Sequence, residues 1–187
     1  MPEHVSGAAL QDALASICQS PRSSGVVEMI VRRPTVNERE VLQQGELSVD
    51  LGLLGDNWAT SWPARQERHP RHREMQINLM NSRVIDAICA GDRQRWPLAG
   101  DQLFVDFDLS EDNLPAGTKI QVGEAVLEVT SEPHLGCKKF ERRFGRNAVL
   151  FVNSDSGKSL KLRGINARVL NPGVVTTGGV IRKLAPI

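Results

Sequence analysis

The pattern of apolar and polar positions predicts many short strands along the chain. Residues 26–31 are rich in β-branched side chains, which favours a first strand. Residues 75–79 and 103–107 alternate apolar with polar positions, as half-buried strands do. The remaining predicted strands are two in 119–130 around a Gly-Glu turn, and 161–170, 173–177 and 179–184.

Helical spacing of apolar residues is limited to short segments. Residues 7–19 have this spacing, and Asn81 is a capping residue that predicts a helix ending near Gly91. Thr35 and Glu38 form a capping-box pattern, which predicts a helix from 35 to about 44, closed by Gly45. Two further short helices are predicted at 137–144 and 146–153, divided by Gly145.

The order of these elements predicts a mainly β, α+β domain. Short strands follow one another with turns between them, and the helices do not alternate strictly with the strands. This favours a β-barrel-like fold over a doubly wound sheet. A length of 187 residues fits about one domain. We expect an N-terminal helix and lead-in over 1–25 and the barrel domain over 26–187.

Charge and composition exclude several classes of partner. The 23 Lys and Arg nearly balance the 22 Asp and Glu, so the chain has no overall basic field for nucleic acid. Aromatic residues are only 4% of the chain, too few for a base-stacking platform. No apolar run approaches the roughly 20 residues of a membrane span. The N-terminus also lacks an apolar signal region, so we expect a cytoplasmic protein without nucleic-acid or membrane partners.

The chain has three cysteines, Cys18, Cys89 and Cys137, with no C-x-x-C pair. This spacing excludes a zinc ribbon and a thioredoxin-type site, and a reducing compartment fits better than a disulfide framework. Cys18 and Cys89 fall on apolar faces of predicted helices, so we expect both of them in the core.

Cys137 stands in a different setting, just before a predicted helix and after Gly136. Five basic residues lie within 137–146 against the single acidic Glu141. A helix start and nearby cations both favour the thiolate over the thiol, whose ordinary pKa is about 8.5. Cys137 is therefore a candidate nucleophile, sulfur carrier or soft-metal ligand. His134 is placed to hold or relay a proton, and the basic residues would attract an anion such as phosphate.

These residues alone leave a plainer interpretation open, in which Cys137 is an inert buried thiol and the cations are a solvated helix face.

A second basic segment covers residues 60–73 and contains His69 and His72. Pro70 separates the two histidines and no carboxylate-rich helix surrounds them. We therefore interpret this segment as a mobile, solvated surface loop rather than as a metal site.

Several segments together resemble a known family. They are PHLGCKKFERRFGRNAVLFVNS, LGLLGDNW, MQINLMNSRV, GDQLFVDFDLSEDNLPAG and LRGINARV. They resemble the MOSC domain, which is found at the C-terminus of molybdenum cofactor sulfurases and in free-standing bacterial proteins. The resemblance spans about residues 26–184. It implies a MOSC, or pyruvate-kinase-like, β-barrel decorated by short helices. It also implies that Cys137 either carries sulfur as a persulfide or ligates the molybdenum of the pterin cofactor.

The resemblance also implies further site residues. Asn113, within Asp112-Asn113-Leu114, and Asp56, after Gly55, match family positions near the pocket. Chemistry applied to the resemblance adds residues that would help with the cofactor phosphate, namely Lys138, Lys139, Arg142 and Arg163. No lysine lies in a recognisable pyridoxal phosphate site, so that cofactor is not assigned. The aminotransferase-like domain or N-terminal barrel of the larger family members does not fit before residue 26.

Three functions therefore compete. The first is a molybdenum-cofactor protein, acting as a sulfur transferase or a molybdenum-dependent oxidoreductase, in which Cys137 is the metal ligand or sulfur carrier. Its partners would be molybdopterin or a small anionic ligand, with a sulfur donor or redox partner protein. The second is a non-catalytic module that binds an anion or a partner. The third is a thiol enzyme that acts on a small electrophile or an N–O compound.

Overall fold

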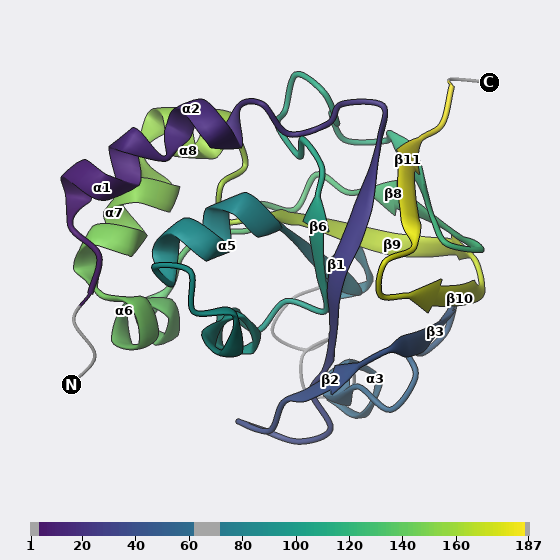
Figure 1. Ribbon diagram of the computed structural model, residues 1–187. Coiled ribbons are helices and arrows are strands. Elements are labelled where there is room, and N and C mark those ends of the chain that lie inside the picture. Colours follow the sequence, from purple (N-terminus) through teal and green to yellow (C-terminus); the bar gives the residue numbers. More distant parts are fainter. Residues whose placement is uncertain (1–3, 62–71, 186–187) are drawn as a thin grey trace.

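A closed barrel forms the centre of the computed structural model, which describes residues 4–61 and 72–185 (Figure 1). The strands follow the order β1-β11-β7-β8-β9-β5-β6, and pairing of β6 with β1 closes the ring. Neighbouring strands are antiparallel except β5 and β6, which run parallel. The bounds are β1 Ser24–Arg32, β5 Ile77–Asn81, β6 Leu103–Asp106, β7 Lys119–Val122, β8 Ala125–Val129, β9 Ile165–Asn171 and β11 Val180–Lys183. The predicted β-barrel is confirmed.

A small second sheet accompanies the barrel. It has the order β10-β3-β4, and β10 lies against β8 while β3 lies against β9. A short strand, β2, extends the barrel sheet along the end of β1. The bounds of these strands are β2 Glu40–Leu42, β3 Gln44–Ser48, β4 Gly52–Leu53 and β10 Gly173–Thr176.

The helix predicted from 35 to about 44 is wrong. Thr35 and Glu38 close a turn, in which the Glu38 N–H donates to the Thr35 carbonyl at 3.3 Å. Asn37 has a positive φ of 72°, which ends any helical path there. Val41 and Leu42 then pair with β1, so strand pairing with a distant segment outweighs the local capping pattern.

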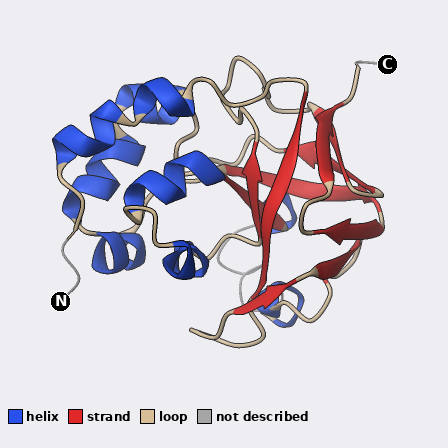
Figure 2. Cartoon of the chain, viewed as in Figure 1, coloured by secondary structure: helices blue, strands red, loops and turns tan. Residues whose placement is uncertain are grey.

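Most helices lie together on one side of the barrel, to the left in Figure 2. They include the pair predicted around Gly145 and the helix capped by Asn81. The predicted 7–19 helix is divided into two at Ala13. The bounds are α1 Gly7–Asp12, α2 Leu14–Ile17, α5 Ser82–Ile88, 3-10 helix η2 Arg93–Ala99, α6 Lys138–Phe144, α7 Arg146–Asn153 and α8 Asp155–Ser159. α1 contacts α7 and α5, while the domain division at residue 25 stays a prediction.

Two of these helices are not indicated by the sequence pattern. α8 has only five residues and contains Gly157, a poor helix former. It forms because the Ser154 hydroxyl caps it, accepting from the Gly157 N–H at 3.0 Å. η2 contains Pro97, which argues against an α-helix but is accommodated by the 3-10 turn.

Two hydrophobic clusters hold the fold together, one inside the barrel and one between the barrel and the helix layer. β6 contributes to both, because Leu103 and Val105 point inside while Phe104 packs under the helices. The strand predicted to be half-buried is therefore buried on both faces over these three residues. The helix layer, which covers the outer face of β6, is the reason.

The basic segment at 60–73 lies mostly outside the described residues, and His69 is among those not described. Its described end forms the short 3-10 helix η1, His72–Met75. His72 is buried and stacks on Trp58 of α3, Asn57–Thr60, with 4.8 Å between the ring centroids. The expectation that His72 is solvated is therefore wrong. Within the ranges 4–61 and 72–185, none of the helices has the length and apolar character needed to cross a membrane.

Candidate functional site

Cys137 follows a loop that runs from the end of β8 to the start of α6. Asparagine side chains hold this loop at both ends. Asn166 donates to the Glu132 carbonyl at 3.0 Å. Asn153 donates to the Gly136 carbonyl at 2.9 Å and accepts from the Gly136 N–H at 2.8 Å. These bonds fix the backbone on each side of His134 and Cys137.

The Cys137 side chain is exposed and occupies the position just before the first turn of α6. Its neutral thiol makes no capping hydrogen bond. Partial burial opposes ionisation, but the backbone N–H groups of Phe140 and Lys139 and the charge of Arg163 outweigh it. The pKa of the Cys137 thiol is therefore lower than its ordinary value. An accessible sulfur that favours the thiolate is what a nucleophile or soft-metal ligand needs.

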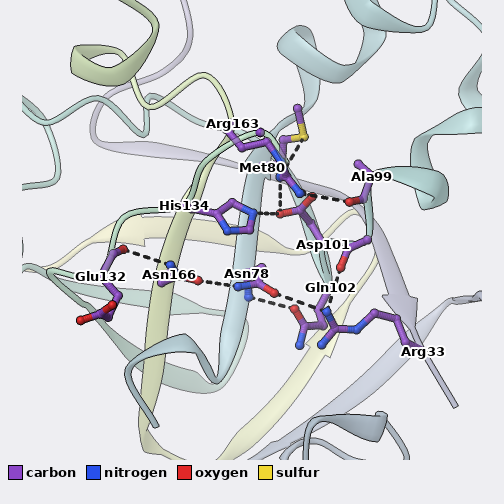
Figure 3. A network of polar contacts seen from close by, with 12 residues as sticks. Arg33, Asn78, Met80, Ala99, Asp101, Gln102, Glu132, His134, Arg163 and Asn166 are labelled. Atoms are coloured by element: carbon purple, nitrogen blue, oxygen red, sulfur yellow. Dashed lines mark hydrogen bonds and ion pairs between the residues drawn. The ribbon is translucent and has the colours of Figure 1, made fainter. Parts of the chain in front are cut away.

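A buried carboxylate, Asp101, connects the barrel to the loop of residues 130–137, which we call the sulfur loop (Figure 3). Its side chain is fully buried and accepts from Arg163 Nη1 at 2.8 Å. His134 Nε2 lies 2.9 Å from the other Asp101 oxygen. Asp101 was not predicted from the sequence. The available signal was the polar pair Asp101-Gln102 immediately before a strand of apolar residues, where unpaired polar groups are costly.

The charge states in this group follow from burial and pairing. Burial opposes the ionisation of Asp101, but Arg163 and His134 outweigh it and lower the pKa of the carboxyl to about 2. Burial and the charge of Arg163 lower the pKa of His134, against the effect of Asp101. His134 is therefore neutral at pH 7. Its Nε2–H donates to the carboxylate, which leaves Nδ1 as a proton acceptor.

Arg163 is buried and already engaged with protein groups. Its Nη2 donates to the Ala99 carbonyl at 3.0 Å, and its guanidinium lies 4.8 Å from the ring centroid of Phe140. Nη1 is used by Asp101. Both Nη groups of Arg163 therefore already donate to protein oxygens.

The other cations predicted near the sulfur are exposed on α6. Lys138, Lys139 and Arg142 form no ion pair with any residue in 4–61 or 72–185. They share the short helix that begins after Cys137, whereas the charge that lowers the pKa of the thiol is that of Arg163. These three side chains are free to turn toward an anion.

The two family-derived positions lie elsewhere. Asn113 is buried, and its amide donates to the carbonyls of Arg22 at 3.0 Å and Asp108 at 2.8 Å. Both amide hydrogens therefore hold the fold together, and Asn113 is not brought to the group around Asp101.

Asp56 is also buried and caps α3 by accepting from the Trp58 N–H at 3.0 Å. It forms an ion pair with Arg33 at 2.8 Å, and Arg33 donates to the Gly100 carbonyl at 2.9 Å, next to Asp101. Asp56 is thus a positioning residue that acts on the site through its ion pair with Arg33.

A row of amide side chains joins these parts across the barrel (Figure 3). Asn78 Nδ2 donates to Asn166 Oδ1 at 2.5 Å, and Asn166 holds the sulfur loop. The Asn78 backbone N–H donates to the Gln102 side chain at 2.9 Å. Three strands, β5, β6 and β9, are therefore tied to the loop that carries His134 and Cys137.

The other two cysteines differ from each other. Cys89 is buried, and burial raises the pKa of its thiol to about 12. Cys18 is exposed, so its expected place in the core is wrong. It follows the last residue of the short helix α2, whose core contact is made by Ile17.

We expect Cys137 to react with iodoacetamide at a lower pH than an ordinary thiol does. The test uses a Cys18→Ser variant, which removes the other exposed thiol and leaves Cys89 buried. The rate of Cys137 alkylation, followed by mass spectrometry, should have its midpoint below about pH 8.5. A midpoint at or above that value would contradict the proposed stabilisation of the thiolate.

The fold and this site define a class of protein, a small β-barrel with an exposed cysteine of lowered pKa that follows a loop held by an Asp–His–Arg group around a buried carboxylate. The family model of the MOSC domain matches residues 56–182, more than half of the sequence. The chain belongs to the MOSC domain family. This membership is compatible with a function related to the molybdenum cofactor.

Solved structures support the fold. The YuaD protein from Bacillus subtilis is 18% identical, with a TM-score of 0.59 over 88% of this chain and 97% of that one. YiiM from Escherichia coli is 18% identical, with a TM-score of 0.54 over 87% and 71% of the two chains. YiiM from Geobacillus stearothermophilus is 17% identical, with a TM-score of 0.52 over 88% and 74%. A search of curated protein sequences found no match.

Proposed function

We propose that this protein binds a molybdenum cofactor through Cys137, with the thiolate acting as metal ligand or as sulfur carrier. The observation that carries the proposal is the exposed Cys137 thiol with a lowered pKa at the start of α6. A thiolate is a soft ligand and suits molybdenum. The donor set also fits an anionic cofactor, since Lys138, Lys139 and Arg142 lie on the same helix with no carboxylate partner in the described part of the chain.

When bound, the cofactor would supply a redox-active molybdenum centre, and the residues of this chain would hold and orient it. Arg163 contributes positive charge near the sulfur. His134 is neutral, so its Nδ1 can take up a proton from a group bound beside Cys137. Asp101 fixes the ring and its tautomer through the bond to Nε2.

In the carrier role, the chemistry is thiol–disulfide exchange with a persulfide donor. The Cys137 thiolate attacks the terminal sulfur of the donor persulfide and forms a new S–S bond. The donor's S–S bond breaks, and its original sulfur leaves as a thiolate. No further oxidant or reductant is needed, because the transferred sulfur keeps its oxidation state. The lowered pKa of Cys137 raises the fraction of attacking thiolate above that of an ordinary thiol.

The test compares wild type, Cys137→Ser and Cys18→Ser, each purified from a host that makes the cofactor. We expect molybdenum and pterin in the Cys137→Ser protein to fall at least about tenfold, as loss of one soft ligand bond should cause. Cys18→Ser keeps an equal number of thiols and should retain both. Persulfide labelling of Cys137 separates the carrier from the ligand role. Equal molybdenum and pterin in all three proteins, without a persulfide on Cys137, would refute the proposal.

A second candidate is a non-catalytic module that binds an anion or a partner, favoured by the exposed, unpaired cations of α6. In that case Cys137→Ser should leave ligand binding intact. Charge reversal at Arg142 and Arg143 should abolish it. The two candidates therefore predict opposite results for the same cysteine variant.

A further inference from the structure

Two arginines from distant segments meet beside the site. Arg39 lies in the connection between β1 and β2, and its Nε donates to the Pro97 carbonyl at 3.1 Å. Arg143 lies on α6, and its Nη1 donates to the Leu98 carbonyl at 2.7 Å. Because these carbonyls belong to consecutive residues, the two guanidinium groups are held close together.

Neither arginine has a carboxylate partner in the described part of the chain. Arg33 and Arg163 pair with the buried Asp56 and Asp101. Arg39 and Arg143 have no such partner within residues 4–61 and 72–185, and their contacts are with neutral oxygens. Both side chains are partly buried. Two like charges held close together repel each other, and an anion bound between them removes this cost.

The electrostatic cost is visible at Arg39. Burial is the largest cause that lowers the pKa of Arg39, and the charges of Arg143 and Arg33 lower this pKa further. Asp56 and Asp101 oppose this without reversing it. An excess of positive charge therefore remains next to Asp101, the residue that holds His134.

Hydrogen-bond donors also remain free there. A guanidinium has five N–H groups. Arg39 Nη2 lies against the backbone of Gly100, where a β-carbon would be 3.6 Å from it, and it has no hydrogen-bond partner in the described parts of the chain. Among residues 4–61 and 72–185, the hydrogen-bond partner of Arg143 Nη2 is Asn37 Oδ1 at 3.5 Å, which is too long for a strong bond.

We propose that Arg39 and Arg143 form a binding site for a phosphate monoester carried by the ligand of Cys137. The inference rests on the proposed function and adds to it the residues that hold the anionic end of the ligand. Paired guanidinium forks match the oxygens of a phosphate group, which accepts several charge-assisted hydrogen bonds at once. The site lies at the carbonyls that precede Asp101, so a phosphate held there is joined to the sulfur loop through Asp101 and His134.

The first test needs no variant. The Nε–Hε signals of a ¹⁵N-labelled protein are followed by NMR during titration with inorganic phosphate and, separately, with glycerol 3-phosphate. We expect the signals of Arg39 and Arg143 to shift and saturate, with tighter binding of the ester. The proposal is wrong if these two signals do not move. The assignment to an ester is wrong if inorganic phosphate binds as tightly as glycerol 3-phosphate.

Variants then measure the contribution of each arginine. Arg39→Gln and Arg143→Gln should each weaken glycerol 3-phosphate binding at least about tenfold, as loss of a charge-assisted bond does. Arg182→Gln is the matched control, because Arg182 is exposed on β11 and bonds only to Gln121. Thermal unfolding checks that the variants fold, and Arg39→Lys, which keeps the charge but loses the planar fork, should bind with intermediate affinity. Unchanged binding in Arg39→Gln and Arg143→Gln overturns the proposal.

The two proposals can fail separately. Cys137→Ser should bind glycerol 3-phosphate like wild type, because the sulfur is not part of the arginine pair. One outcome is that glycerol 3-phosphate binding depends on the two arginines while Cys137→Ser has the same molybdenum content as wild type. This outcome would support the phosphate site and refute the cysteine role. The opposite outcome is that molybdenum content falls in Cys137→Ser while phosphate binding is unchanged in the arginine variants. That outcome would support the cysteine role and refute the phosphate site.

Discussion

Replacing Asp101 by Asn should lower the free energy of unfolding by about 3–5 kcal/mol, because it leaves a buried cation without its anion. The Asp101 side chain is fully buried, and Arg163 is 94% buried and cannot turn to water. An amide removes the charge while keeping the shape, so the loss reports on electrostatics rather than on a cavity. Chemical denaturation measured by circular dichroism gives the free energy.

Asp112→Asn is the matched control. Asp112 is also paired with an arginine, Arg22, but the Asp112 side chain is 82% exposed. An exposed pair contributes about 0–1 kcal/mol, so this variant should be nearly neutral. Adding Arg163→Met to Asp101→Asn should recover much of the loss, because the unpaired charge is removed. A loss at Asp101 no larger than at Asp112 would contradict this account of the buried pair.

The same pair gives the wild type a defined acid sensitivity. The pKa of Asp101 in the folded protein is lowered to about 2, below the unfolded value of about 3.9. The unfolded chain therefore binds the proton first as the pH falls. The stability that Asp101 contributes is fully present above about pH 4 and is lost as the pH falls toward 2. Asp101→Asn should lack this part of the pH dependence, which unfolding curves at pH 2–5 would reveal.

Gly164→Ala should be the second large effect, lowering the free energy of unfolding by about 2–4 kcal/mol. Gly164 has a φ of 109°, and a β-carbon there would lie 2.1 Å from the Leu79 carbonyl oxygen. Neither the strained dihedral nor the backbone clash can be relieved by turning a side chain. The same β-carbon would lie 3.3 Å from Cδ2 of His134, so the ring would also be displaced.

Gly117→Ala separates the two causes. Gly117 has a similar φ of 89°, but nothing lies within 4 Å of a β-carbon at that position. It should therefore show the dihedral strain alone, on the order of 1 kcal/mol. Slower alkylation of Cys137 in Gly164→Ala than in Gly117→Ala would indicate that the loop carrying His134 and Cys137 has moved. Equal losses of stability in the two variants would exclude the clash with Leu79.

Local pattern was sufficient for most of the elements. The β-branched run of β1, the turn between β7 and β8, and the Gly145 break between α6 and α7 are all encoded within a few neighbouring residues. The error at 35–44 has the same origin. Thr35 and Glu38 offer a local capping pattern, but Val41 and Leu42 are decided by pairing with β1.

The sequence by itself determined the barrel class and singled out Cys137, because strand periodicity and a cysteine among cations are local features of the chain. Only the tertiary structure decided what surrounds that sulfur. Asp101 meets His134 across 33 residues and Arg163 across 62 residues of sequence. Arg39 and Arg143 meet only because both reach the carbonyls at the end of η2. Burial and pairing of charges arise from contacts between distant segments, and no local pattern records them.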